Sequence, residues 1–290
     1  MSILIASFPE TAHIAKKVSK LIKANFSQIS VQDFPDEEYK LALKKNPKNK
    51  TVIIFNSITN DPDNKLIETI LAGGIARDYG AKKVILLATY FPYMRQDKHF
   101  INYDSFSSKY VIRLFSNFDK LILVDPHLHR IKDIKELSSR AETLSLNNLI
   151  AEYIRKRFKK DFLIVGPDEE SVQWSGEIAK ILKKKVVILS KIRLSPTNIR
   201  QKRVNLNKSK NIIVIDDIIS TGKTISNTLK MAKSQGAKNL VCIGIHGVLV
   251  NKADKLITKN AELITTNTIP NKYSKIDISK LIADKLREFK

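Results

Sequence analysis

Two adjacent carboxylates and a turn of small polar residues occur together in the C-terminal half of the chain. Asp216 and Asp217 directly follow the apolar run Ile212–Ile215, which is suited to a buried strand. Open α/β sheets bind ligands at the carboxyl ends of their strands, and carboxylates there accept hydrogen bonds from sugar hydroxyls, directly or through Mg²⁺. A diol site beside a phosphate site predicts binding of a ribose 5-phosphate unit. The phosphate would lie against a turn that leads into a predicted helix N-terminus, formed by Ser220, Thr221, Gly222, Lys223 and Thr224.

The same stretch has two alternative interpretations. Gly222-Lys223-Thr224 ends like a Walker A loop, G-x-x-x-x-G-K-[ST], but Asp217 stands where the first glycine of that loop belongs. A carboxylate at that position would repel the polyphosphate around which the loop wraps. The acid pair could also act only as an N-cap for the following helix. Burying two acids after four apolar residues is costly for a cap alone, which favours the sugar-phosphate interpretation.

The composition of the chain limits the classes of partner that the protein can be expected to bind. The formal net charge of +22 could indicate nucleic-acid binding or a lysine-rich protein with small anionic ligands. The basic residues are scattered, without an aromatic-interleaved stripe or a known nucleic-acid-binding motif, so no nucleic-acid partner is expected. No apolar run approaches the roughly 18 residues of a membrane span, and the start, MSILIASFPE, lacks a basic segment, so neither a membrane partner nor a secretory signal is expected. One cysteine, Cys242, makes no internal disulfide, which fits a cytoplasmic protein.

Strand and helix patterns alternate along the chain, which predicts an α/β fold with mainly parallel sheets. Ile225, Leu229 and Ala232 are spaced to share one face of a helix, and Leu66, Ile70 and Gly74 are spaced to share a face of another. The apolar runs expected to form buried strands are Thr51–Phe55, Val84–Ala88, Leu121–Val124, Phe162–Val165, Val186–Leu189, Ile212–Ile215 and Leu240–Ile245.

Two segments of the chain look alike. TVIIFNSITN, a helix ending RDYGAK and the run KVILLATY form the first, and NIIVIDDIIS, a helix ending KSQGAK and NLVCIGIHG form the second. Each GAK places a glycine where a helix C-cap is needed, just before a strand. The chain is therefore predicted to fold as two related α/β domains, residues 1–142 and 143–290, joined near residues 140–147. Only the second copy carries the acid pair, because Asn56-Ser57 takes its place in the first.

The acid pair and its turn resemble the loop of the type I phosphoribosyltransferase superfamily, which binds phosphoribosyl pyrophosphate (PRPP). Five further motifs resemble, in the same order, those of the ribose-phosphate pyrophosphokinase family, which makes PRPP. They are FPDEE at 34–38, PYMRQDK at 92–98, VDPHLHR at 124–130, VGPDEES at 165–171 and SKIRLSP at 190–196.

The resemblance implies a role for each motif. Lys191 and Arg193 would be catalytic, on a long basic loop able to close over ATP. His127 and Asp168 would organise the metal, and the loop from Asp216 to Thr224 would bind ribose 5-phosphate. The ATP-binding residues implied are Phe34, Asp36, Glu38, Arg95, Gln96, Asp97 and His127.

Taken singly, several of these motifs also have plain structural interpretations. FPDEE could be an acidic surface turn, and Asp168 an acidic N-cap. The loop carrying Lys191 could be a solvated lysine-rich loop, and His129 an ordinary polar residue at a strand end.

The chain also departs from the family pattern. Glu37 replaces a glycine, Tyr103-Asp104 replaces a Gly-Glu pair, and Glu169 and Glu170 stand where small residues are usual. Lys223 likewise occupies a place where the family usually has a small residue.

The resemblance implies two tandem phosphoribosyltransferase-like domains, each a mainly parallel sheet flanked by helices, with the extreme C-terminus packing back on the first. The N-terminal domain would bind ATP and make dimer contacts. The expected reaction is transfer of the β,γ-diphosphoryl group of ATP to the 1-hydroxyl of ribose 5-phosphate, with Mg²⁺ as cofactor, in a homodimer or higher homo-oligomer. A phosphoribosyltransferase that consumes PRPP and a non-catalytic homologue are the alternatives. The first does not need PYMRQDK, and the second should have lost Lys191, Arg193, His127 or Asp168.

Overall fold

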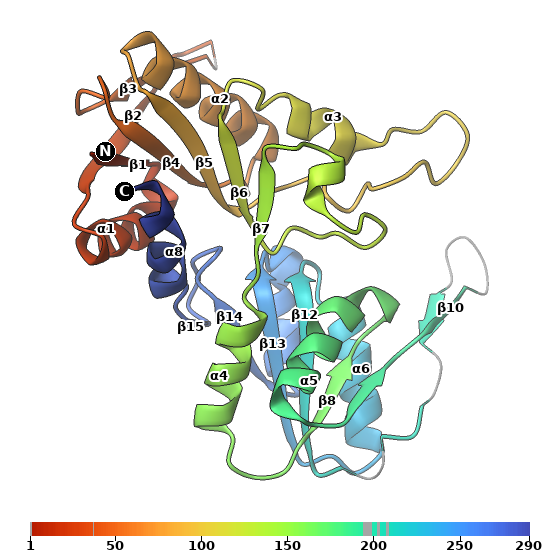
Figure 1. Cartoon of the computed structure of the whole chain (residues 1–290). Coiled ribbons are helices and arrows are strands. Elements are labelled where there is room, and N and C mark those ends of the chain that lie inside the picture. Colours follow the sequence, from red (N-terminus) through yellow and green to blue (C-terminus); the bar gives the residue numbers. More distant parts are fainter. Residues whose placement is uncertain (1, 37, 194–198, 202–203, 207–208) are drawn as a thin grey trace. The chain divides into compact units, whose positions relative to one another are not determined.

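The computed structural model describes the backbone of residues 2–36, 38–193, 199–201, 204–206 and 209–290, and the side chains of these residues except 191–193 and 199–201. The chain divides into two compact units (Figure 1). Unit 1 comprises Met1–Leu144 together with Ile278–Lys290, and unit 2 comprises Ser145–Asp277. The sequence had placed the division after residue 142. In the structure the last strand of unit 1 runs to Leu144, and the C-terminal segment groups with unit 1.

Unit 1 is built on a seven-stranded sheet in the order β3-β2-β1-β4-β5-β6-β7. Its strands pair in parallel except for β2 and β3, which form an antiparallel hairpin at one edge. Parallel order follows from the helical crossovers between successive strands. The strands are β1 (Ile3–Ser7), β2 (Asn25–Asp33), β3 (Tyr39–Leu43), β4 (Thr51–Ser57), β5 (Lys83–Tyr90), β6 (Lys120–Val124) and β7 (Ala141–Leu144).

The helices of unit 1 cover this sheet. The C-terminal helix α8 packs beside α1 (Figure 1). The Lys285 ammonium of α8 forms an ion pair with Glu142 of β7 at 3.0 Å, which ties the end of the chain to the last strand. The helices are α1 (Ala12–Leu21), α2 (Pro62–Asp78), α3 (Ser107–Arg113) and α8 (Ser279–Leu286), with short 3-10 turns η1 (Pro9–Thr11), η2 (Ile134–Glu136) and η6 (Arg287–Phe289).

Unit 2 has a six-stranded, fully parallel sheet in the order β15-β14-β13-β12-β8-β9. A separate antiparallel hairpin, β10 with β11, lies between β9 and β12 along the chain. The strands are β8 (Leu163–Gly166), β9 (Val186–Ile188), β10 (Lys191–Arg193), β11 (Ile199–Gln201), β12 (Asn211–Ile219), β13 (Asn239–Gly247), β14 (Glu262–Thr266) and β15 (Ser274–Ile276). The helices are α4 (Asn147–Arg157), α5 (Glu177–Leu182), α6 (Lys223–Ser234) and α7 (Ala253–Thr258), with short turns η3 (Glu169–Ser171), η4 (Val172–Gly176) and η5 (Val250–Lys252).

Each unit has its own hydrophobic core. All seven predicted strands are present, although β9 is partly exposed rather than buried and β12 continues four residues beyond its predicted end. Ile225, Leu229 and Ala232 are buried on α6 as predicted. On α2 the buried face includes Leu66 as predicted, but Gly73 lies deeper than Gly74, because the Phe118 ring packs against it. Within the described residues, no helix has the length and apolar character needed to cross a membrane.

The duplication read from the sequence is present in the backbone. Gly80 and Gly236 both adopt left-handed φ angles, +81° and +92°, as the two GAK motifs predicted. The alanine after each glycine donates its N–H back to the last turn of its helix, at 3.0 Å in unit 1 and 3.1 Å in unit 2. The next two N–H groups then donate to the carbonyl of Lys50 in unit 1 and of Lys210 in unit 2. Both copies therefore join helix to strand through the same set of backbone hydrogen bonds.

Candidate active site

The acid pair lies near the carboxyl end of β12, the strand at the centre of the unit 2 sheet. The strand does not stop before the acids, because Ile218 and Ile219 still pair with His246 and Gly247 of β13. Successive strand residues point to opposite faces of a sheet, so the two carboxylates point to opposite sides of β12. Asp217 is buried, with 4% of the residue exposed, whereas Asp216 is half-buried. Asp216 is thus the more accessible of the two carboxylates.

A short turn connects β12 to α6. Only Ser220, Thr221 and Gly222 separate the strand from the helix. Gly222 has a φ of +70°, and a Cβ on it would meet the Ala253 Cβ and the Ile257 Cδ1 at 3.2 Å, so both the conformation and the space favour glycine. A Walker A loop needs six residues from its first to its second glycine, and here three of those positions belong to β12. The geometry therefore excludes the P-loop interpretation.

The turn leaves a helix N-terminus at the carboxyl edge of the sheet. Lys223 and Thr224 begin α6, a helix of twelve residues, and Ser226 donates its N–H to the Gly222 carbonyl at 2.8 Å. The first N–H groups of a helix have no partner within the helix and carry a partial positive charge. With the hydroxyls of Ser220, Thr221 and Thr224, this turn has the donors that a phosphate monoester requires.

Asp168 lies at the same edge of the sheet, because it follows β8, which pairs with β12. Its carboxylate caps η3 by accepting the Ser171 N–H at 3.3 Å. The N-cap interpretation is therefore realised, although a carboxylate has further lone pairs for other ligands. Gly166 allows this turn to pack closely, since a Cβ there would lie 2.3 Å from the Ser171 Oγ and 2.6 Å from the Ser175 Oγ.

The two predicted catalytic residues are placed only by their backbone. Lys191 and Arg193 are the first and last residues of β10 and pair with Gln201 and Ile199 of β11. Their side chains lie outside the part of the chain that the structure describes.

One polar feature of unit 2, the contact of His246 with Thr268, was not predicted from the sequence. His246 is buried at the end of β13, and its Nδ1 lies 2.9 Å from the Thr268 Oγ1. Thr268 in turn donates its hydroxyl to the Ile245 carbonyl at 3.0 Å, which secures the loop after β14 to β13. Burial, and secondarily the Asp216 carboxylate, raises the pKa of the Cys242 thiol, so this cysteine stays a neutral core residue.

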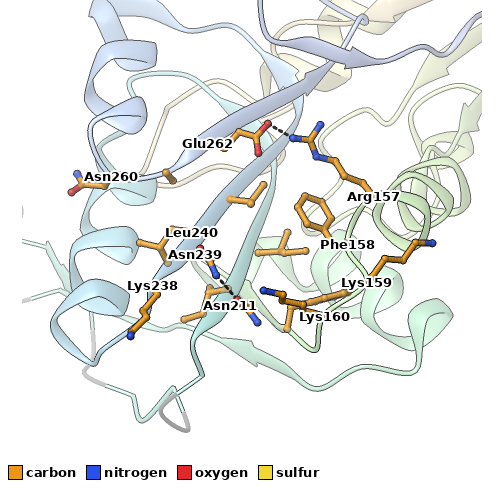
Figure 2. Close-up of a pocket in the computed structure, with 15 residues that line it drawn as sticks. Arg157, Phe158, Lys159, Lys160, Asn211, Lys238, Asn239, Leu240, Asn260 and Glu262 are labelled. Atoms are coloured by element: carbon orange, nitrogen blue, oxygen red, sulfur yellow. Dashed lines mark hydrogen bonds and ion pairs between the residues drawn. The ribbon is translucent and has the colours of Figure 1, made fainter.

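A pocket of about 680 Å³ lies at the opposite, amino edge of the unit 2 sheet (Figure 2). It is lined by residues at the starts of β12 and β13 and by the segment after α4. None of the predicted site residues lines it. The acid pair and this pocket therefore occupy opposite ends of the same strand, β12.

In unit 1, the motifs PYMRQDK and VDPHLHR leave neighbouring parallel strands, β5 and β6, at the carboxyl edge of the sheet. The buried Asp97 carboxylate joins them, since it accepts the Arg130 N–H at 2.9 Å and pairs with the Arg130 guanidinium at 2.7 Å. His127, only 5% exposed, lies within the loop fixed in this way. Sequence reasoning placed Asp97 with ATP and missed Arg130, because a contact between residues 33 positions apart leaves no periodic pattern.

Both loops contain a non-glycine residue with positive φ. Tyr93 has a φ of +64° and Asp125 a φ of +36°, and the second precedes a proline. Such backbone conformations cost on the order of 1–3 kcal/mol each and tend to cluster at functional sites. Between these strained positions, Arg95 and Gln96 are exposed at the sheet edge. The Gln96 Oε1 accepts hydrogen bonds from the hydroxyls of Ser105 and Ser107, so the loop after PYMRQDK folds back on it.

The FPDEE motif forms the exposed turn between β2 and β3. Phe34 donates its N–H to the Glu38 carbonyl at 2.7 Å, and the Asp36 Oδ1 accepts the Glu38 N–H at 3.3 Å. Glu37 lies outside the described residues. Phe34 is 42% exposed, which is high for a phenylalanine. β1 and β4 separate β2 from β5, so this turn and the PYMRQDK loop start from strands that are about 14 Å apart, at roughly 4.8 Å per strand.

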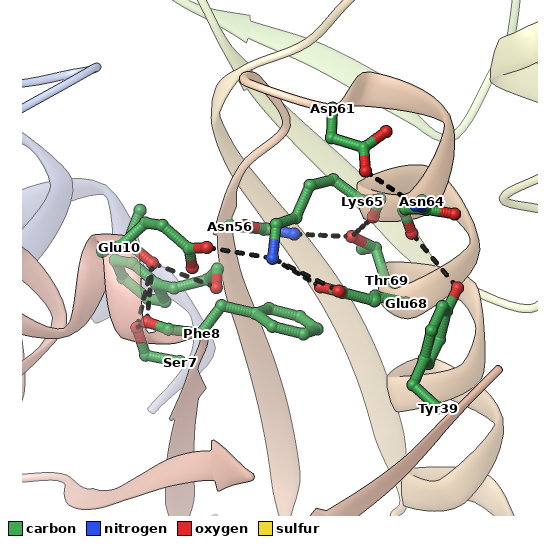
Figure 3. A network of polar contacts seen from close by, with 12 residues as sticks. Ser7, Phe8, Glu10, Tyr39, Asn56, Asp61, Asn64, Lys65, Glu68 and Thr69 are labelled. Carbon is green, nitrogen blue, oxygen red and sulfur yellow. Dashed lines mark hydrogen bonds and ion pairs between the residues drawn. The ribbon is translucent and has the colours of Figure 1, made fainter. Parts of the chain in front are cut away.

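The unit 1 counterpart of the phosphate-binding turn is filled by its own side chains (Figure 3). The Lys65 ammonium lies 2.9 Å from carboxylate oxygens of both Glu10 and Glu68. Asn56, which takes the place of Asp216, donates its Nδ2–H to the Thr69 hydroxyl at 2.8 Å. Hydrogen bonds and ion pairs thus hold Glu10, Asn56, Glu68 and Thr69 around Lys65. Unit 1 therefore lacks an open turn like the one in unit 2.

Next to this network is a pocket of about 360 Å³ whose charge is mainly negative. Three carboxylates against one ammonium would repel a triphosphate, but the exposed aromatic ring and acceptor oxygens suit a heteroaromatic ring with an amino group. The lining residues are Asp33, Phe34, Tyr39, Asp61, Asn64, Lys65 and Glu68.

Among the described residues, no three His, Cys, Asp or Glu side chains come together as a ready-made metal cage. Mg²⁺ usually retains water and binds through one or two carboxylates plus substrate phosphates, so it does not need such a cage. Asp168 and Asp216 supply oxygen donors at one edge of unit 2. His127 belongs to unit 1 and supplies a nitrogen donor. The oxygen donors fit Mg²⁺ better than the imidazole does.

The chain matches two family models over most of its length. Residues 3–118 match the N-terminal domain of ribose phosphate pyrophosphokinase, and residues 134–279 match the phosphoribosyl transferase domain. Among curated proteins, the ribose-phosphate pyrophosphokinase of Pyrococcus furiosus is 32% identical over 260 residues, which cover 88% of this chain and 91% of the relative. The ribose-phosphate pyrophosphokinase of Methanobrevibacter smithii is 30% identical over 299 residues and 98% of each chain.

The fold is also that of a solved structure. The crystal structure of phosphoribosylpyrophosphate synthetase from Mycobacterium smegmatis superposes with a TM-score of 0.88 at 22% identity, covering 99% of this chain and 98% of the other. The likeness confirms the predicted fold of two phosphoribosyltransferase-type domains. With the family models and the curated relatives, it leads to one conclusion: the chain is an enzyme of the ribose-phosphate pyrophosphokinase family.

Proposed function

We propose that this enzyme transfers the intact β,γ-diphosphoryl group of ATP to the 1-hydroxyl of ribose 5-phosphate, giving PRPP and AMP. The observation that carries the proposal is the end of β12, where an accessible carboxylate is followed by a three-residue turn into a helix N-terminus. Sugar hydroxyls and a terminal phosphate are the groups that such a pair of sites binds. Membership of the family supports the diphosphoryl transfer.

In unit 2, the half-buried Asp216 accepts hydrogen bonds from the ribose hydroxyls. The buried Asp217, on the other side of the strand, is the second carboxylate that would position the ribose hydroxyls, with help from the metal. The turn from Ser220 to Thr224 binds the 5-phosphate. Because Lys223 is exposed at the first position of α6, its ammonium adds at most one charge-assisted contact to that phosphate.

In unit 1, Arg95 and Gln96 contact ATP from the exposed edge of the sheet. Asp97 is a positioning residue, because its pair with Arg130 fixes the loop of His127. The ring of Phe34 and the oxygens of Asp36 and Glu38 contact the adenine of a neighbouring chain's ATP.

In unit 2, Asp168 would be a ligand of Mg²⁺, with Asp216 as a further oxygen donor. In unit 1, His127 would be the metal ligand that the family resemblance implies. When bound, Mg²⁺ neutralises phosphate charge and favours displacement at the β-phosphorus. Lys191 and Arg193 stabilise the charge that develops on the transferred group. Catalysis would rest on positioning and electrostatics.

The test is product analysis by phosphorus NMR with ATP, MgCl₂ and ribose 5-phosphate. AMP and PRPP should appear in equal amounts, because the diphosphoryl group moves as a unit. ADP as the stoichiometric product would mean transfer of a single phosphoryl group and would contradict the proposal. A phosphoribosyltransferase or a non-catalytic homologue would form no PRPP from these substrates.

A further inference from the structure

The pocket at the amino edge of the unit 2 sheet combines apolar and basic lining residues. The lining includes four buried apolar residues at the starts of β12 and β13. Ile213 pairs with Val241 on one face of the sheet, and Ile212 pairs with Leu240 on the other. Phe158 forms part of the same lining (Figure 2). A volume of about 680 Å³ lies in the range of about 300–1,000 Å³ that is typical of small-molecule sites.

The positive charge of this pocket is not neutralised by nearby acids. Glu262, the acid in the lining, is paired with Arg157 at 2.5 Å. Asp161, the acid next in sequence to Lys160, is paired with Lys184 at 2.6 Å. Within the described residues, neither Lys160 nor Lys238 has a carboxylate at ion-pair distance, and the Lys159 ammonium donates only to the Arg155 carbonyl. Three lysine ammonium groups therefore remain available to an anion.

The polar groups of the pocket are held in fixed positions. Asn239 donates its Nδ2–H to the Asn211 Oδ1 at 2.7 Å, and Asn211 donates to the Asp161 carbonyl at 2.6 Å. The Arg157 guanidinium lies over the Phe158 ring, 5.5 Å from its centroid, which restrains the ring at the pocket wall. A preorganised wall binds a ligand at a smaller entropic cost.

The duplicated unit provides an internal comparison. At the corresponding amino edge of unit 1, Arg77 is paired with Asp119 and Lys120 with Glu142, and Arg140 donates to the Ser116 carbonyl at 2.6 Å. These three cations are satisfied within the unit, whereas Lys159, Lys160 and Lys238 of the unit 2 pocket have no ion pair among the described residues. Lys82, the unit 1 counterpart of Lys238, has none there either. The difference is not required by the fold, because the two edges are built from the same kind of strand–helix–strand repeat.

We propose that this pocket is a binding site for a small phosphate monoester that carries an aromatic ring. The phosphate would bind to Lys159 and Lys160, on one side of the pocket, and the ring would lie on the apolar lining beside Phe158. This site is separate from the one at Asp216 and Asp217, because it lies at the other end of β12. The proposal does not depend on the proposed reaction.

The test uses methyl NMR of the full-length protein, with 1-naphthyl phosphate as the probe. The methyl groups of Ile212, Ile213, Leu240 and Val241 report on the pocket, and those of Ile219 report on the carboxyl edge. The four pocket residues should shift with a single dissociation constant while Ile219 stays unchanged. 1-Naphthol, which has the ring but no charge, and inorganic phosphate, which has the charge but no ring, should each bind at least about tenfold more weakly.

A charge-reversal pair identifies the anion-binding residues. Lys159→Glu with Lys160→Glu should raise the dissociation constant for 1-naphthyl phosphate at least about tenfold. Lys44→Glu with Lys45→Glu, two adjacent exposed lysines of unit 1, makes the same change in net charge and should leave it unaltered.

Three results would overturn the proposal. They are shifts at Ile219 without shifts at the pocket, equal affinity for 1-naphthol, and equal weakening by the two charge-reversal pairs. The last would show that net charge alone, and not this pocket, attracts the probe.

Discussion

At the scale of single residues, Lys65 shows how side chains of unit 1 fill the counterpart of the turn after β12. Its ammonium lies between the carboxylates of Glu10 and Glu68 at the position where unit 2 has an open turn. Burial lowers the pKa of Lys65, but hydrogen bonds to Glu68 and Glu10 outweigh it and raise the pKa above 10.5. Burial raises the pKa of Glu68 above 4.5, against the opposing effect of Lys65. The lysine is therefore needed to keep two acids together in unit 1.

Replacing Lys65 by methionine should destabilise the fold by about 2–3 kcal/mol at pH 7, because Glu68 is left as a buried, uncompensated carboxylate. The loss should shrink as the pH falls toward 4.5. With its folded pKa raised, Glu68 holds a proton more tightly when folded than when unfolded. Its ionisation therefore begins to oppose folding as the pH rises above the unfolded value of 4.5, and does so fully once the pH exceeds the raised folded pKa. Urea unfolding followed by circular dichroism at pH 7 and pH 5 measures both effects.

The control for this prediction is the double variant Lys65→Met with Glu68→Leu. It removes both charges and should recover at least half of the lost stability, because an apolar pair of similar volume replaces a buried ion pair at little cost. A double variant as unstable as Lys65→Met alone would show that packing, and not charge, explains the effect.

At the scale of elements, the connection from β12 to α6 carries the proposed phosphate site, and a glycine determines its shape. Gly222 and Gly236 stand at the two ends of the same helix, both with positive φ. They differ in their surroundings, since a Cβ on Gly222 would press on Ala253 and Ile257 while a Cβ on Gly236 would meet nothing within 4 Å. Alanine substitutions at these two glycines therefore distinguish the effect of backbone strain alone from the effect of distorting the proposed phosphate-binding turn.

Gly236→Ala should cost about 1–2 kcal/mol of stability, the usual strain of a left-handed alanine, and leave ribose 5-phosphate binding unchanged. Gly222→Ala should cost at least as much and also weaken ribose 5-phosphate about tenfold or more, because the turn must shift to relieve its contacts. Thermal unfolding and isothermal titration with ribose 5-phosphate measure the two quantities. Equal affinities in the two variants would place the phosphate somewhere other than this turn.

The elements that the sequence predicted are those with strong local patterns. Apolar runs such as Thr51–Phe55 and the glycines of the two GAK motifs depend on a few neighbouring residues, and the structure confirms them. The strands β1, β2, β3, β7, β14 and β15 were not among the predicted runs. The last, Ser274–Ile276, is three residues long and mostly polar.

The parts of the site that were missed depend on contacts between distant residues. The Asp97–Arg130 pair joins positions 33 residues apart, and the Lys65 network joins three elements of unit 1. No spacing in the sequence encodes such contacts. The acid pair could be predicted at the end of a strand because its chemistry and its strand lie in one short stretch.

At the scale of the whole molecule, the position of the FPDEE turn bears on whether one active site is built from one chain or from two. Phe34 is exposed, and its strand is separated from β5 by two others in the sheet. A turn that completes the ATP site of a neighbouring chain would explain both observations.

Mixing two inactive variants tests this expectation. The triple variant Phe34→Ala, Asp36→Ala and Glu38→Ala would lack the donated turn, and Lys191→Ala would lack its own catalytic lysine. In a mixed dimer, the site in the triple-variant chain has an intact lysine and receives an intact turn from its partner. With random pairing, half of the dimers are mixed and one of their two sites works, so activity should recover to roughly a quarter of wild type.

Co-expression of the two variants provides the mixed oligomers, and PRPP formation is the readout. Light scattering on the same samples establishes that they are oligomeric. If mixed oligomers form and stay inactive, the turn acts within its own chain and the donated-turn model is wrong.

The shared backbone bonds of the two repeats have a consequence for protein engineering. The amino edges of both repeats are fixed by equivalent hydrogen bonds to Lys50 and Lys210, so the carboxyl edges can be exchanged without disturbing the helix-to-strand junctions. Ser57 and Asp217 occupy equivalent positions in the two repeats. Four residues separate Ser57 from the start of α2, and five separate Asp217 from the start of α6. A graft of the unit 2 turn into unit 1 would thus need one inserted residue and removal of the Lys65 charge. The resulting chain would carry two phosphate sites on one scaffold.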